Sequence, residues 1–128
     1  MVSVSKIRFH KRGLETTMGP LECDILKVLW KKRNAKVRDI YRIVRKKRKV
    51  ALTSIAVILD RLHKKNLVSR KMESGRGGYH YIYATKISRD DFEYSIVEGT
   101  VNKLIECFGP TAINYFNERF KRKAVMPK

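Results

Sequence analysis

The apolar pattern of the chain changes from a helical to a strand spacing at Asn66, and this change constrains the fold most. In residues 53–65, apolar side chains recur at intervals of three and four, which predicts a helix with one buried face. Residues 67–72 then alternate apolar and polar side chains, as a half-buried strand does. Residues 74–78 form a glycine-rich turn, and residues 79–84 are rich in strand-forming types. The order predicts a helix followed directly by a β-hairpin.

Two further helices are expected before this unit. Pro20 suits the first position of a helix, and apolar residues recur after it at intervals of three and four residues. Residues 31–34 close that helix, and a second is expected over about residues 36–44. Three helices followed by a glycine-tipped hairpin predict a winged helix-turn-helix. The expected fold is therefore mostly α, with a small β-hairpin wing.

Positive charge is concentrated in the first two thirds of the chain. The 128 residues include 30 Lys and Arg against 12 Asp and Glu, for a net charge of +18. Residues 1–87 hold 23 of the basic and 6 of the acidic side chains, a net charge of +17. Like charge at this density repels itself and favours a polyanionic partner. We expect double-stranded DNA, with a general solubility surface as the alternative.

The third helix and the turn supply the candidate DNA-binding residues. The major groove of B-DNA admits one helix, so residues 53–65 are expected to enter it while residues 74–78 reach the backbone. Thr53 and Ser54 either cap the helix or both cap it and contact DNA. Val57 is placed for contact with a thymine methyl group. The candidate set is Thr53, Ser54, Val57, Arg61, Lys64, Arg76, Lys47, Arg48 and Lys49.

Two basic segments lie outside the predicted helix and turn. Residues 45–49 are all Lys or Arg, which is typical of a solvated loop or helix end. They lead straight into the third helix and would contact the DNA backbone if that helix enters the groove. Residues 1–17 are a basic N-terminal arm, which is either a phosphate-contacting arm or a frayed terminus.

The C-terminal third is nearly neutral and is expected to pair two copies of the chain. Residues 88–91 resemble a helix capping box, and Gly109-Pro110 separates two helices. These helices carry more apolar side chains than one small domain covers, so we expect a two-fold dimer; the alternative is that they fold back onto their own chain. The candidate dimerisation residues are Phe92, Ile96, Val97, Val101, Leu104, Ile105, Phe108, Ile113 and Phe116. The expected organisation is a basic arm (1–17), a winged-helix DNA-binding domain (18–87), dimerisation helices (88–120) and a basic tail (121–128).

The sequence has no catalytic or metal-binding pattern. Its three histidines fall in different predicted elements, and Cys23 and Cys107 lie far apart. Neither metal-ligand spacing nor a nucleophile with an adjacent base is found. There is no apolar run of the roughly 18 residues that a membrane span needs, and no signal-peptide pattern. We expect a cytoplasmic homodimer that is not an enzyme and uses no cofactor, no metal and no membrane.

Four motifs resemble those of the penicillinase and methicillin-resistance repressor family, which includes copper-responsive repressors. They are Met18-Gly19-Pro20-Leu21-Glu22, Val28-Leu29-Trp30, Val37-Arg38-Asp39-Ile40 and Leu59-Asp60-Arg61-Leu62-His63-Lys64-Lys65-Asn66-Leu67-Val68. The resemblance implies a dimeric winged-helix repressor that binds a two-fold symmetric operator. It also implies that Thr53, Ser54 and Val57 face the groove, although the family typically has threonine at the last two positions.

Two departures from the family concern regulation. Its β-lactam-responsive members are inactivated by cleavage at an Asn-Phe bond, and no Asn-Phe pair occurs in this sequence. Its copper-responsive members carry a cysteine-rich C-terminal motif, whereas this chain has two isolated cysteines. Neither induction mechanism carries over.

A second function class fits the same fold. The net charge of +17 on residues 1–87 is higher than operator binding needs. The alternative is therefore a chromatin-like or RNA-associated nucleic-acid-binding protein with low sequence preference.

Overall fold

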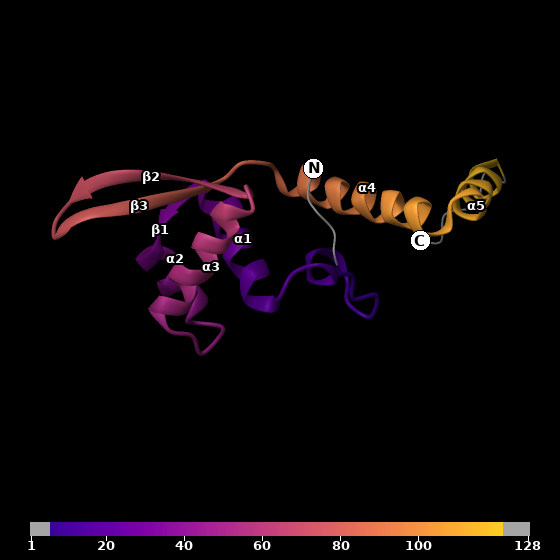
Figure 1. Ribbon diagram of the computed structural model, residues 1–128. Coiled ribbons are helices and arrows are strands. Elements are labelled where there is room, and N and C mark those ends of the chain that lie inside the picture. Colours follow the sequence, from indigo (N-terminus) through magenta and orange to yellow (C-terminus); the bar gives the residue numbers. More distant parts are fainter. Residues whose placement is uncertain (1–5, 122–128) are drawn as a thin grey trace.

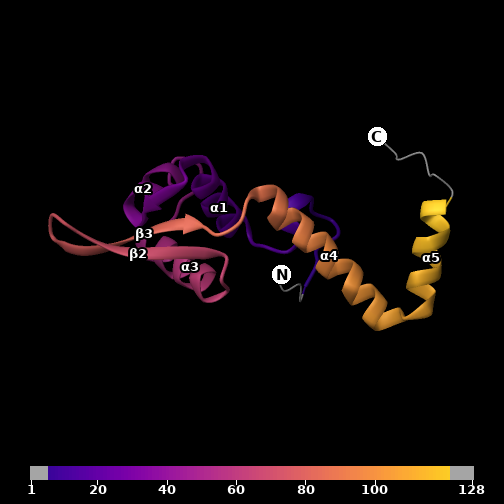
Figure 2. The same cartoon turned by 90° about the horizontal axis from the view of Figure 1, so that it is seen from above.

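The computed structural model describes residues 6–121 and shows a winged-helix domain from which two further helices extend (Figure 1). The elements of the domain, in chain order, are the 3₁₀ helix η1 (Gly13–Thr16), α1 (Pro20–Lys32), β1 (Asn34–Lys36), α2 (Val37–Val44), α3 (Leu52–Lys64), β2 (Val68–Gly75) and β3 (Gly78–Thr85). The extending helices are α4 (Arg89–Phe108) and α5 (Pro110–Lys121). Viewed from above, α4 leads away from the domain and α5 turns off its far end (Figure 2).

A three-stranded antiparallel sheet forms beside the three helices, with strand order β1-β3-β2. The β2–β3 hairpin closes where Gly75 pairs with Gly78. Gly77 and Gly78 have φ angles of 84° and 111°, a region that glycine adopts without strain. Strand β1 was not predicted from the sequence, because three residues are too few to display a period of two. The pairing of Ala35 with Tyr83 creates this strand.

Helix α3 begins one residue earlier than the sequence suggests, and its N-cap is not a hydroxyl side chain. Ala51 occupies the N-cap position, and its carbonyl accepts from the amides of Ser54 and Ile55 at 3.1 and 3.4 Å. The prediction that Thr53 or Ser54 caps the helix is therefore wrong, and both side chains project from its first turn. Asn66, which follows the end of α3, has a left-handed backbone geometry with a φ of 65°.

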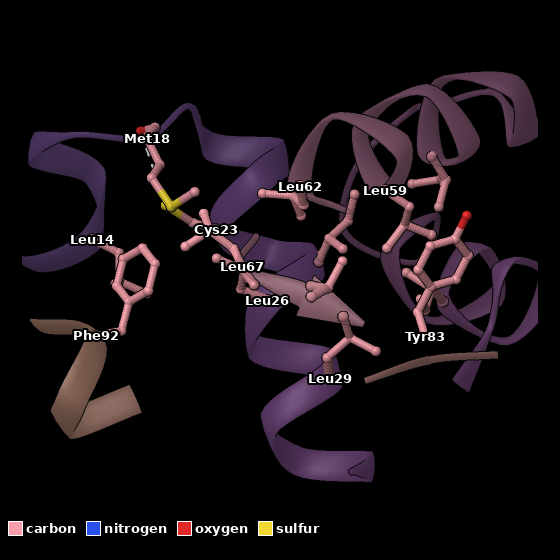
Figure 3. Close-up of a cluster of buried hydrophobic side chains, with 14 of the residues drawn as sticks. Leu14, Met18, Cys23, Leu26, Leu29, Leu59, Leu62, Leu67, Tyr83 and Phe92 are labelled. Atoms are coloured by element: carbon pink, nitrogen blue, oxygen red, sulfur yellow. Dashed lines mark hydrogen bonds between the residues drawn. The ribbon is translucent and has the colours of Figure 1, made fainter. Parts of the chain in front are cut away.

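The core lies between the three helices and the inner face of the sheet (Figure 3). Leu26 and Leu29 from α1, Leu59 and Leu62 from α3 and Tyr83 from β3 are all buried. Each helix supplies residues spaced by three or four, so each turns one apolar side inward. This packing fixes α3 and leaves its opposite side at the surface.

The first turn of α4 belongs to this core. Phe92 is 1% exposed, and its ring meets the Trp30 ring edge-on at a centroid distance of 5.9 Å. The Trp30 indole N–H donates to the Ile87 carbonyl at 2.9 Å, and the Ser88 hydroxyl accepts from the Asp91 amide at 3.1 Å. The junction between the wing domain and α4 is therefore anchored by packing and hydrogen bonds.

Part of the basic N-terminal segment is folded onto the domain. Leu14, in η1, is buried in the core, and the Arg8 guanidinium donates to the carbonyls of Glu15 and Met18 at 3.4 and 3.1 Å. Over these residues the structure differs from the frayed terminus considered above. Residues 1–5 of the arm and residues 122–128 of the basic tail lie outside the described residues.

We expect the two cysteines to differ sharply in reactivity. Cys23 is buried, and this burial, followed by the nearby Glu15 carboxylate, raises the pKa of its thiol to about 11. Cys107 is exposed on α4. Because the thiolate is the reactive form, one thiol per native chain should react quickly with an alkylating reagent at pH 8, and the second only in denaturant. Two thiols that react at equal rates in the native protein would contradict the buried position of Cys23.

The same raised pKa makes stability depend on alkaline pH. The folded state favours the neutral Cys23 thiol, so the contribution of this thiol to stability is fully present below the ordinary pKa of 9.0 and is lost as pH rises towards about 11.

Within residues 6–121, no helix combines the length and apolar character that crossing a membrane requires.

Candidate nucleic-acid interface

The outward side of α3 carries a short row of polar and apolar side chains flanked by cations. Thr53, Ser54, Val57 and Arg61 are exposed and, with Leu21 and Ile58, line one depression of about 360 Å³. The first turn of α3 has no acidic residue, so its amide end presents positive potential without a competing carboxylate. The structure thus brings together four of the residues that the sequence assigned to DNA.

The basic run 45–49 forms an exposed turn between α2 and α3. The amides of Lys47 and Arg48 both donate to the Val44 carbonyl, at 3.0 Å, and this bends the chain after α2. The Arg48 guanidinium donates to the Asp24 carboxylate of α1 at 2.8 Å. Arg48 therefore ties the turn to α1, while Lys47 and Lys49 are exposed.

The wing projects beyond the helices, with Arg76 at its tip (Figure 1). Between the wing and the start of α2 lies a cleft of about 590 Å³, whose lining includes Lys36, Arg38 and Arg76. Lys36 and Arg38 were not among the predicted DNA-binding residues, because only the pairing of β1 with β3 brings them beside the wing. This cleft has the cationic lining that a phosphate backbone requires.

An ion-pair network joins α3 to the wing. The Asp60 carboxylate accepts from Arg70 of β2 at 3.0 Å through one oxygen, and its other oxygen lies 3.1 Å from the Lys64 ammonium. The Arg70 guanidinium lies over the Tyr81 ring, 4.4 Å from its centroid. Hydrogen bonds from Lys64 and then Arg70 hold the pKa of Asp60 below its ordinary value. The four-residue spacing of Asp60 and Lys64 predicts their ion pair, but no sequence pattern predicts the contact between Asp60 and Arg70.

The predicted dimerisation residues fall into two groups. Phe92 and Ile96 are buried in the core of the same chain, so they offer no surface to a partner. Val97, Val101, Leu104 and Phe108 are spaced by four, three and four, which places them on one side of α4. Ile113 on α5 is exposed, whereas Ile105 and Phe116 are partly exposed.

The apolar surface of α4 and α5 also includes three side chains outside the predicted dimerisation set. Tyr94, Tyr115 and Phe120 are exposed, and the Phe116 and Phe120 rings stack at 6.5 Å. Exposed apolar side chains gathered on two neighbouring helices mark an interaction surface rather than an ordinary solvent-facing one.

Similarity to a solved PadR family structure supports the winged-helix fold. A PadR family transcription regulator from Clostridium difficile R20291 is 20% identical, with a TM-score of 0.51, over 70% of this chain and 98% of that one. The YusO protein from Bacillus subtilis is 16% identical, with a TM-score of 0.49, over 86% of this chain and 77% of that one. The mostly helical architecture with a small antiparallel sheet, predicted from the sequence, is confirmed.

Sequence comparison places the chain more narrowly. The penicillinase repressor of Staphylococcus aureus is 25% identical over 83 residues, which are 65% of this chain and 63% of that protein. The match thus spans less than two thirds of the relative's length. The penicillinase repressor family matches residues 18–123, a region that runs from α1 through α5. Its members are transcriptional regulators rather than enzymes, and this chain belongs to the penicillinase repressor family.

Proposed function

We propose that this chain is a DNA-binding transcriptional repressor that acts as a homodimer on a two-fold symmetric operator. The observation that carries the proposal is the depression on α3, where Thr53, Ser54, Val57 and Arg61 lie together at the surface. The basic 45–49 turn leads towards the same helix, and Arg76 of the wing lines a cleft together with Leu52 at the start of α3. A rigid helix with a mixed polar and apolar outer side, set among cations, fits the major groove of DNA.

In this proposal α3 reads base edges and the cations fix its register. Ser54 and Val57 lie in the first two turns of α3, where Val57 meets a thymine methyl group and Ser54 a base or phosphate. Arg61, Lys47 and Lys49 contact phosphates, and the cleft beside Arg76 receives the neighbouring backbone. Lys64 and Arg48 contribute less, because each is bonded to a carboxylate of its own chain.

A second copy completes the operator complex. Its α4 and α5 cover the exposed apolar side chains of the first copy, so the two wing domains face DNA together. Linking two modest half-site interactions raises the overall affinity without new base contacts. A bound dimer then represses by occupying DNA that transcription needs.

The net charge of +17 on residues 1–87 favours one alternative, a nucleic-acid-packaging role with little sequence preference. The two functions differ in whether binding to a preferred DNA sequence persists at physiological salt. An operator-specific dimer retains one, whereas a packaging protein does not.

Replacing Arg61 with alanine tests the assignment of α3. If Arg61 contacts phosphate, R61A weakens binding to all duplexes about equally and lowers the slope of log affinity against log salt by about one. The control is Lys121→Ala, which removes an exposed positive charge at the end of α5 and should leave the slope unchanged. Fluorescence titrations from 50 to 300 mM KCl measure both. An unaltered slope in R61A would remove Arg61 from the interface.

A further inference from the structure

One carboxylate of α3, the helix that we propose enters the major groove, lies on the same side as its DNA-facing residues. Positions 53, 57, 60 and 64 are spaced by four, three and four, so Asp60 shares a stripe of α3 with Thr53, Val57 and Lys64. The side chain of Asp60 is 41% exposed and that of Lys64 is 75% exposed. A negative charge in this place repels phosphates and so opposes DNA binding.

Asp60 is also the point at which the recognition helix is connected to the wing. Its Oδ1 accepts from Arg70 of β2 at 3.0 Å, and Arg70 rests on Tyr81 of β3. Tyr81 packs edge-on against Tyr83 at 6.1 Å, and Tyr83 is buried in the core. The chain of contacts therefore runs from α3 through both wing strands into the core.

This network contributes little to the stability of the fold, because exposed ion pairs stabilise a fold weakly. Its contacts bear instead on how the cations can bind DNA. Carboxylate and phosphate oxygens compete for the same guanidinium and ammonium groups. While Asp60 holds Arg70 and Lys64, neither is free to bind a phosphate in an arbitrary position.

We propose that Asp60 is a specificity-determining residue, which withholds Arg70 and Lys64 from non-operator DNA and fixes the wing relative to α3. The inference rests on the proposed function. Binding to non-operator DNA is almost wholly electrostatic, so it loses affinity when two cations are occupied. Binding to the operator requires base contacts from α3 and backbone contacts from the wing in one register, so it gains from the fixed geometry.

The variant Asp60→Asn keeps the shape of the side chain and removes its charge. Binding of the full chain to a mixed-sequence duplex and to a duplex selected for tight binding is titrated against KCl. On the mixed duplex, the salt slope should steepen by about one to two, and each freed cation should raise affinity about fivefold to tenfold at 0.1 M salt. Affinity for the selected duplex should change much less, because the loosened wing offsets the gain. The ratio of the two affinities therefore falls.

Two further variants identify the cause. Glu93→Gln removes the same charge from a comparable pair, Arg89–Glu93 at 3.2 Å on α4, and should leave the slope unchanged. In the D60N background, adding Arg70→Ala should bring the slope back by about one, whereas Arg70→Ala alone should not alter it.

The possible outcomes distinguish a failure of the inference about Asp60 from a failure of the proposed DNA-binding function. If D60N weakens binding to both duplexes equally with an unchanged slope, Asp60 is only structural and the inference is overturned. The same holds if D60N retains the selectivity of the natural chain. If the natural chain itself binds neither duplex, the proposed function fails instead.

Discussion

A chain carrying both Val97→Asp and Phe108→Asp is expected to be monomeric and to bind its operator about 100-fold more weakly or worse. Both side chains are 62% exposed, so the substitutions leave the core intact. In a dimer they would place two pairs of carboxylates in an apolar interface, where each loses its hydration without gaining a cation. Loss of the second half-site removes an avidity gain of about 10²–10⁴. Sedimentation velocity and DNA titration measure the two effects.

The control for this experiment is Asn102→Asp, which adds a carboxylate to α4 away from the stripe of Val97, Val101, Leu104 and Phe108. This variant should remain dimeric. If the double variant also sediments as a dimer and binds with unchanged affinity, the partner surface lies elsewhere on the chain.

Replacing Phe92 with alanine should lower the free energy of unfolding by about 3–5 kcal/mol, the range for removing a buried aromatic side chain. The ring is 1% exposed and contacts Trp30, so its loss leaves a cavity at the junction of α4 and the wing domain. Urea unfolding followed by Trp30 fluorescence measures the change. The control Phe9→Ala removes the same ring from a site that is 79% exposed and should change stability by less than about 0.5 kcal/mol.

A loss of stability no greater than that of the Phe9 variant would contradict the packing of Phe92. The result also bears on how the domain can be isolated. A fragment that ends at residue 87, where the charge distribution changes, lacks Phe92 and would leave Trp30 exposed. A wing domain intended for separate study should therefore extend through the first two turns of α4.

Sequence periodicity predicted the elements that depend on local pattern. Helix α3 and the β2–β3 hairpin each repeat apolar residues at the period of their own geometry, so both were predictable to within three residues at each end. Strand β1 was not, because its three residues become a strand only through pairing with β3. The cap of α3 was misassigned because a hydroxyl near a helix start is a common signal, and here a backbone carbonyl performs the role.

The candidate site was predictable where residues act from one element, and not where they meet across elements. The exposure of Thr53, Ser54 and Val57 follows from the helical period, since Ile55, Leu59 and Leu62 on the opposite side of α3 are buried. Apolar character alone could not separate Phe92 from Val97, because both are large and lie on the same helix. Which of them faces the core depends on the position of Trp30, which only the packing reveals.

Selection of bound duplexes from a random pool, followed by footprinting of the selected duplexes at about 0.2 M salt, shows whether paired copies of this chain recognise a specific DNA sequence. Two copies of the chain that present α3 side by side should select two inverted half-sites, with centres about one DNA turn or a multiple of it apart. The footprint should cover both half-sites together. A pool that yields no shared sequence, with binding that is lost steeply as salt rises, would contradict the repressor assignment and leave a nucleic-acid-packaging role.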